Sequence, residues 1–129
     1  MKIRLIAALA LIIGLAACNK KEDPQEVTKM LKSDAIILTE SHWAPLQNGD
    51  TIRLSFEENT REGGIMRDDT TSIFAKVFID SAMVAEAHEI PWQGFYVVDL
   101  EPGSHELFAT GRVNLKEFSL HGISLYVTK

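Results

Sequence analysis

The sequence has one cysteine in 129 residues, Cys18. A single thiol cannot form an intrachain disulfide, so packing alone has to hold the fold together. Long apolar runs are also missing. The longest, Leu5–Ala17, would form a helix of about 20 Å, which is shorter than the roughly 30 Å hydrocarbon core of a bilayer. This run is too short for a permanent membrane span and is typical of the core of a signal peptide.

Basic residues are outnumbered, because the chain has 13 Lys and Arg against 18 Asp and Glu, a net charge of −5. Removal of residues 1–17 takes away Lys2 and Arg4 and no acid, which leaves a mature chain with a net charge of −7. Nucleic-acid phosphates require surfaces rich in Lys and Arg, so we expect no nucleic-acid partner. The 112 residues from Cys18 onward are enough for one domain with one hydrophobic core.

Cys18 follows two small residues and precedes a burst of charge. The segment Leu15–Cys18, "LAAC", resembles the lipobox of bacterial lipoproteins, in which the cysteine is lipidated and becomes the first residue of the mature chain. The resemblance implies a cleaved signal peptide over 1–17 and acyl chains such as palmitate on Cys18, with the lipid bilayer as their partner. An ordinary signal peptide with an incidental cysteine is the alternative.

The residues after Cys18 bear on localisation. Asn19 is not the aspartate that retains many lipoproteins in the inner membrane, and Lys20–Asp23 is similar to the export signal of surface lipoproteins of Bacteroidota. The resemblance implies a cell-envelope protein at the outer membrane, exposed at the cell surface or to the periplasm. We expect residues 18–33 to be the lipidated cysteine with a flexible tether, although Val27, Met30 and Leu31 would also suit a short amphipathic helix.

Beyond residue 34 the apolar residues change to a period of two, as in Ile52, Leu54 and Phe56. Short segments of this kind, separated by turn residues such as Asn48–Asp50 and Asp80–Ser81, predict strands. They are 35–40, 51–57, 72–80, 82–89, 94–100, 105–113 and 118–128. We therefore expect an all-β protein, a single antiparallel β-sandwich of about seven strands over 34–129. Residues 57–72, with Gly63–Gly64 and dense charge, are expected to form a solvated, mobile loop.

Several of these segments resemble bacterial immunoglobulin-like domains over about residues 34–128. The opening "IILTESHWAPLQNGDTIRL" has Pro45, Gly49 and Ile52 in the order typical of that family, and "VVDLEPGSHELFATG" is the best-matched stretch. The resemblance implies an immunoglobulin-like sandwich. Ser81 replaces the usual hairpin glycine, and "ATGRVN" removes an aspartate that some such domains use for calcium. Independently, Pro102 and Gly103 predict a turn with positive φ at the glycine.

Residue patterns for catalysis or metal binding are missing. No serine lies in a G-x-S-x-G elbow, and the four histidines have neither the helical spacing of a metal site nor a nearby cysteine, so we expect them at surfaces or edges. They are His42, His88, His105 and His121. The acids near the long loop, Glu57, Glu58, Asp68 and Asp69, are interrupted by arginines. We therefore expect no enzyme, no metal and no cofactor.

Aromatic residues are the remaining candidates for a ligand site. Trp43 and Trp92 lie at or near prolines, and both could stack on sugar rings, with Trp92 and Tyr96 as the first pair to test. Alternatively, both tryptophans close the ends of the core. We expect a non-enzymatic envelope lipoprotein that is a binding or accessory module for a glycan or protein partner, with specificity in loops 57–72 and 88–95. The alternative is a structural, assembly or immunity-type lipoprotein that binds a single protein through an exposed strand edge.

Overall fold

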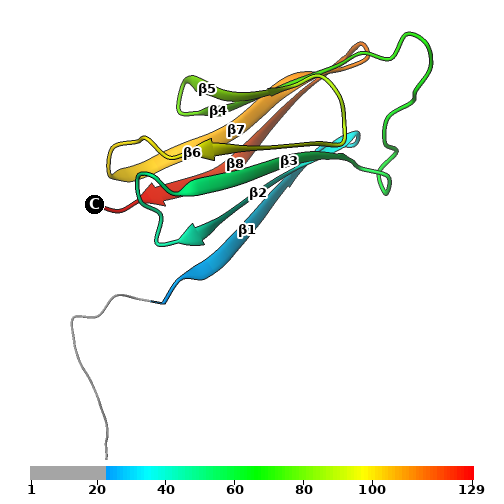
Figure 1. Ribbon diagram of the computed structural model, residues 1–129. Helices are drawn as coiled ribbons and strands as arrows, with labels where there is room; N and C mark the ends of the chain where they lie inside the picture. Colours follow the sequence, from blue (N-terminus) through cyan, green and yellow to red (C-terminus); the bar gives the residue numbers. More distant parts are fainter. Residues whose placement is uncertain (1–22) are drawn as a thin grey trace, which may run out of the picture.

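The computed structural model describes residues 23–129, which form eight β-strands in two four-stranded antiparallel sheets (Figure 1). The signal peptide expected at 1–17 and the lipidation expected at Cys18 lie outside the described residues. The strands are β1 (Gln25–Lys32), β2 (Ile36–Ala44), β3 (Thr51–Glu58), β4 (Ile73–Ile79), β5 (Ala82–Ala87), β6 (Trp92–Val97), β7 (Gly103–Val113) and β8 (Lys116–Val127). Within residues 23–129, no helix is long and apolar enough to cross a membrane.

The two sheets have the strand orders β1-β2-β3-β6 and β5-β4-β7-β8 and face each other as the layers of a sandwich (Figure 1). Edge strand β1 approaches edge strand β8, where the Lys29 ammonium donates to the Ser124 carbonyl at 2.9 Å. At the other edge β6 approaches β5. The expectation of an all-β, antiparallel, sandwich-like domain is therefore confirmed, with one strand more than the sequence indicated.

The additional strand is β1, which corrects the expectation of a flexible tether through Ser33. All eight residues of β1 pair with β2, from Gln25 opposite Ala44 to Lys32 opposite Ile37. Val27 and Leu31 are half-buried, whereas Met30 is exposed. A spacing of four fits one face of a helix and also one face of a strand, so this pair did not distinguish the two. Pairing with β1 satisfies the backbone groups that β2 would otherwise expose at the sheet edge.

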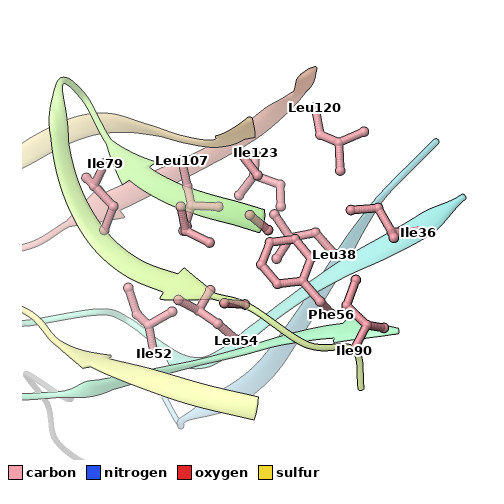
Figure 2. Packing of buried hydrophobic residues seen from close by; sticks show 14 of the residues in the cluster. Ile36, Leu38, Ile52, Leu54, Phe56, Ile79, Ile90, Leu107, Leu120 and Ile123 are labelled. Carbon is pink, nitrogen blue, oxygen red and sulfur yellow. The ribbon is translucent and has the colours of Figure 1, made fainter. Parts of the chain in front are cut away.

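The space between the sheets is filled by aliphatic side chains around one phenylalanine (Figure 2). Ile52, Leu54 and Phe56 project inward from β3, as their alternation predicts, and Phe56 is fully buried. Ile36 and Leu38 of β2 lie beside them, and the opposite sheet contributes buried residues that include Val77, Ile79, Leu107, Ile123 and Leu125. Each such side chain contributes about 1.5–3 kcal/mol on burial, so this layer stabilises the fold without a crosslink.

Two expected turns are confirmed by the backbone. Asp80 and Ser81 connect β4 to β5, and Asp80 has a φ of 56°. Aspartate tolerates this left-handed region better than most residues. Its carboxylate accepts a hydrogen bond from the Glu106 amide at 3.1 Å, and its own amide donates to the Glu106 carbonyl at 2.8 Å. Gly103 has a φ of 123°, as expected for the glycine after Pro102.

Candidate functional site

The candidate aromatic residues lie on two different sides of one sheet. Trp92 and Tyr96 are half-buried on the inner side of β6, and the Trp92 ring packs against Phe56 with 5.7 Å between ring centroids. Trp43 is 51% exposed and alternates with buried His42, so it lies on the outer side of β2. The fold therefore does not bring Trp43 together with Trp92 and Tyr96. Packing at the margin of the core accounts for Trp92.

An exposed aromatic side chain that the sequence reasoning missed lies between Trp92 and Tyr96 in the chain. Phe95 is 67% exposed on the outer side of β6, opposite Arg53 of β3. Strand alternation could have found it, because Phe95 is one residue from Tyr96 and must project to the opposite face.

The long loop 59–72 is tied to neighbouring segments at both ends. The buried side chain of Asn59 donates to the Ser33 carbonyl at 2.7 Å, and the Gly64 amide donates to the Asp34 carbonyl at 3.2 Å. At the far end, Asn114 of the β7–β8 turn donates through its side chain to the Met66 carbonyl at 3.1 Å. These contacts join three segments, 33–35, 59–72 and 114–115, at one end of the sandwich. We call this end the tip.

The tip displays two large apolar side chains. Leu115 is 95% exposed and Met66 is 82% exposed. Both line a groove of about 800 Å³ between the three segments, whose other apolar lining residues are Ala35, Ile65, Val113 and Phe118. They also line a second groove of about 510 Å³. Met66 and Leu115 therefore border both grooves. The β1–β2 and β7–β8 turns of the tip lie at the end of the sandwich opposite the first residues of β1 (Figure 1).

Each of the four histidines has a carboxylate partner, an arrangement that the sequence reasoning missed. The ring nitrogens and carboxylate oxygens are 2.5 Å apart for His42 and Glu40, 3.3 Å for His88 and Glu86, 2.6 Å for His105 and Asp80, and 3.2 Å for His121 and Glu106. The pairs are separate: within residues 23–129, no three side chains of His, Cys, Asp or Glu are grouped in a way that could hold a metal ion.

His105 has an acceptor at each ring nitrogen. Nδ1 lies 2.6 Å from the Asp80 carboxylate and Nε2 lies 2.7 Å from the Glu101 carbonyl. Only the protonated imidazole can donate to both. The hydrogen bond to Asp80, and then the one to Glu101, raise the pKa of His105 above its usual 6.5. The same bond with His105 lowers the pKa of Asp80, and the Glu106 amide lowers it further.

The pair of Glu40 and His42 corrects the expectation that all four histidines lie at surfaces or edges. Glu40 is fully buried and His42 is 6% exposed, because both project inward from β2 between apolar neighbours. Glu40 Oε2 lies 2.5 Å from His42 Nδ1, whereas Oε1 is buried without a hydrogen-bond partner. A buried oxygen without a hydrogen-bond partner is energetically unfavourable, so this pair lowers the stability of the core at this position.

Ser119, His121 and Glu106 are connected in the order of a hydrolase triad on the outer face of β7 and β8. Ser119 Oγ lies 2.9 Å from His121 Nε2, and His121 Nδ1 lies 3.2 Å from Glu106 Oε2. The imidazole also stacks on Phe108, with 4.8 Å between ring centroids. However, the side chains of His121 and Glu106 are 52% and 53% exposed. Water at this open position competes for the hydrogen bonds that a catalytic triad would strengthen in a dry site.

Comparison with known proteins does not add a relationship: no family model, no curated protein and no solved structure matches this chain.

Proposed function

We propose that the protein is a non-enzymatic lipoprotein of the cell envelope, anchored through acyl chains on Cys18, and that its folded domain binds a partner outside the cytoplasm. The observation that carries the proposal is the "LAAC" segment directly before the charged residues. Residues 19–24 separate Cys18 from β1 and can span about 20 Å at most. The anchor would therefore hold the sandwich near the bilayer. Asn19 and the charged residues Lys20–Asp23 favour the outer membrane, with the domain facing the cell surface or the periplasm.

The strand order supports the further proposal that the domain is immunoglobulin-like. In the immunoglobulin fold, strands A, B and E are neighbours in one sheet, and C, F and G are neighbours in the other. Here β2, β3 and β6 are neighbours in one sheet, and β4, β7 and β8 in the other. We assign them to A, B, E and C, F, G in that order, with β5 as C′. On this assignment β1 is an addition beside strand A.

A binding role is supported by what the domain displays. The tip loops are held by hydrogen bonds to their neighbours, which is the arrangement of a rigid scaffold that presents binding loops. The groups arranged most like catalytic ones, Ser119 and His121, lie on an open sheet face. Both a glycan and a protein fit this general role. The exposed Trp43 and Phe95 favour a glycan. The exposed Met66 and Leu115 favour the second candidate, a structural, assembly or immunity-type lipoprotein that binds a single protein partner.

Metabolic labelling with palmitate tests the anchor. We expect label in the wild-type protein and recovery of the protein in the membrane fraction, because acyl chains on Cys18 bind the bilayer. A Cys18→Ser variant should lose the label and keep residues 1–17. An unmodified thiol on Cys18 in the mass spectrum of the native protein, with residues 1–17 present, would overturn the proposal. Intrinsic tryptophan fluorescence measured with neutral oligosaccharides tests the glycan option.

A further inference from the structure

The tip presents two large apolar side chains, Met66 and Leu115, on a backbone that is held by hydrogen bonds. Single exposed apolar residues are common, but Met66 and Leu115 are adjacent to one groove and both project almost fully into solvent. The Asn114 side chain fixes the Met66 carbonyl, and the Asn114 amide donates to the Ser72 carbonyl at 2.6 Å. The backbone that carries both side chains is therefore already ordered in the protein without a partner. A preformed surface loses little conformational entropy on binding.

The chemistry of the groove favours a protein over a sugar. Its exposed apolar surface comes from a thioether and a branched aliphatic chain, and its one aromatic ring, Phe118, is half-buried. Methionine and leucine have no flat face for a pyranose ring, but they suit the irregular apolar centre of a protein interface. The groove of about 800 Å³ is large enough to accept a bulky side chain of the partner beside Leu115.

The charges around the groove indicate the partner's sign. Three carboxylates line it, from Asp34, Glu62 and Glu117, against the single ammonium of Lys116. Lys116 pairs with Asp34, and Arg112 pairs with Glu117 at 3.0 Å. Because the other two carboxylates are paired, Glu62 gives the groove an excess of one negative charge, on a chain whose net charge is −5. A partner with basic residues around its contact would be attracted and oriented by this field.

Two other occupants fit less well. A second copy that used the same surface would place acidic groove against acidic groove around a two-fold axis, which is unfavourable. The chain's own N-terminus is too short if the signal peptide is removed, because residues 18–22 span about 17 Å at most and β1 alone is about 26 Å long. This second argument rests on the proposed function.

We propose that the tip is a docking surface for a protein that presents an aliphatic or aromatic side chain bordered by Lys or Arg. Leu115 and Met66 are its apolar anchors, and Glu62 contributes the charge preference. With Cys18 in the membrane, the surface would face away from the bilayer, since β1 begins at the end of the sandwich opposite the tip (Figure 1).

Site-specific photocrosslinking in the cells that make the protein tests this. The photoreactive residue p-benzoylphenylalanine replaces Leu115 in the full chain, and in the control it replaces Tyr126, a 65% exposed aromatic residue on β8. We expect one protein adduct at position 115 and none at 126, with the crosslinked peptide carrying an apolar residue next to Lys or Arg. The purified partner should bind Leu115→Ser about tenfold more weakly or worse, Tyr126→Ser as the wild type, and all forms more weakly in about 0.5 M salt.

The result that would overturn the inference is an adduct at 115 with a glycan, a lipid, a second copy or an acidic protein segment, an equal adduct at 126, or no adduct. Palmitate labelling of the same cells separates the two proposals. Label without an adduct at 115 retains the anchor and removes the docking surface. An adduct without label retains the docking surface and removes the anchor.

Discussion

His105 Nδ1 lies 2.6 Å from Asp80 Oδ2, a contact that joins the β4–β5 turn to the first residues of β7. Asp80 also exchanges two hydrogen bonds with the backbone of Glu106. The turn is thus held by these two hydrogen bonds and by an ion pair, which forms only when His105 is protonated and Asp80 is ionised. Both conditions hold between the ordinary pKa values of the two groups, 3.8 and 6.5.

This pair predicts a pH dependence of stability. The pKa of His105 is raised in the folded state. The contribution of the pair to the free energy of unfolding is therefore fully present below pH 6.5 and is lost as the pH rises through the pKa of His105 in the folded protein. A His105→Gln variant should lose more stability at about pH 5.5 than at about pH 8.5, measured as the urea midpoint against wild type. His88→Gln is the control, because the His88 side chain is 67% exposed. Parallel pH curves for wild type and His105→Gln would contradict the prediction.

Effects of very different size on stability are expected for two phenylalanines that the strand alternation places on opposite sides of the same sheet. Phe56 is fully buried, and Phe56→Ala should destabilise the fold by about 3–5 kcal/mol through lost burial and a cavity. Phe95 is 67% exposed, and Phe95→Ala should change stability by no more than about 0.5 kcal/mol. Chemical denaturation of both variants measures the difference. Similar losses in both would mean that the inward and outward faces are assigned incorrectly.

Hydrogen exchange can test β1 directly. If residues 25–32 pair with β2, several of their amides should be protected about as strongly as those of β3, whereas a solvated tether exchanges freely. Leu31→Asp should weaken this protection because Leu31 is half-buried against the core, and Lys32→Asp is its exposed neighbour and control. Rapid exchange throughout 25–32 in the wild-type protein would return this segment to a tether.

Sequence patterns identified the parts of the fold whose signal is local. The alternation of Ile52, Leu54 and Phe56 predicted β3, and Asp80–Ser81 predicted the turn after β4, because both depend on neighbours in the chain. The strand β1 was missed because its stability comes from pairing with β2. Its half-buried apolar residues, Val27 and Leu31, are four positions apart, which also fits one face of a helix. The pairs of His105 with Asp80 and of His121 with Glu106 were not predicted from the sequence either. The pairing of β4 with β7 and of β7 with β8 brings these residues together.

The candidate site was harder to predict than the fold. Trp92 and Trp43 look alike in the sequence, each near a proline, yet one packs on Phe56 and the other faces solvent. Leu115 follows Asn114 in a two-residue turn, where no periodicity reports on exposure. The grooves at the tip form only when loop 59–72 meets the β7–β8 turn, which involves residues about 50 positions apart.

A negative result is expected for ester hydrolysis. Ser119, His121 and Glu106 have the connectivity of a triad, but their exposure leaves any oxyanion without a dry, preorganised site. Purified protein should therefore hydrolyse p-nitrophenyl acetate at the same rate as its Ser119→Ala variant. His121→Ala corrects for unspecific attack by imidazole. A rate that falls by about a hundredfold or more in Ser119→Ala would establish a nucleophile and refute the non-enzymatic proposal.

The buried pair of Glu40 and His42 on β2 tests how the core tolerates paired polar groups. Glu40 is fully buried and its one hydrogen bond is to His42. His42→Leu removes this partner and leaves an isolated buried carboxylate, so we expect a loss of about 3–5 kcal/mol. Replacing both residues removes the polar groups and both desolvation penalties together. The double variant Glu40→Leu/His42→Leu should therefore be much more stable than His42→Leu alone and equal to wild type or better.

Urea denaturation of the two single variants and the double variant completes this cycle, with Thr39→Leu/Ser41→Leu on the outward side of the same strand as the control. A strongly favourable coupling between Glu40 and His42 is expected. If instead the double variant is the least stable of the series, the pair itself stabilises the fold. In that case the unpartnered Oε1 must be satisfied in solution, by a buried water or by another group of the core.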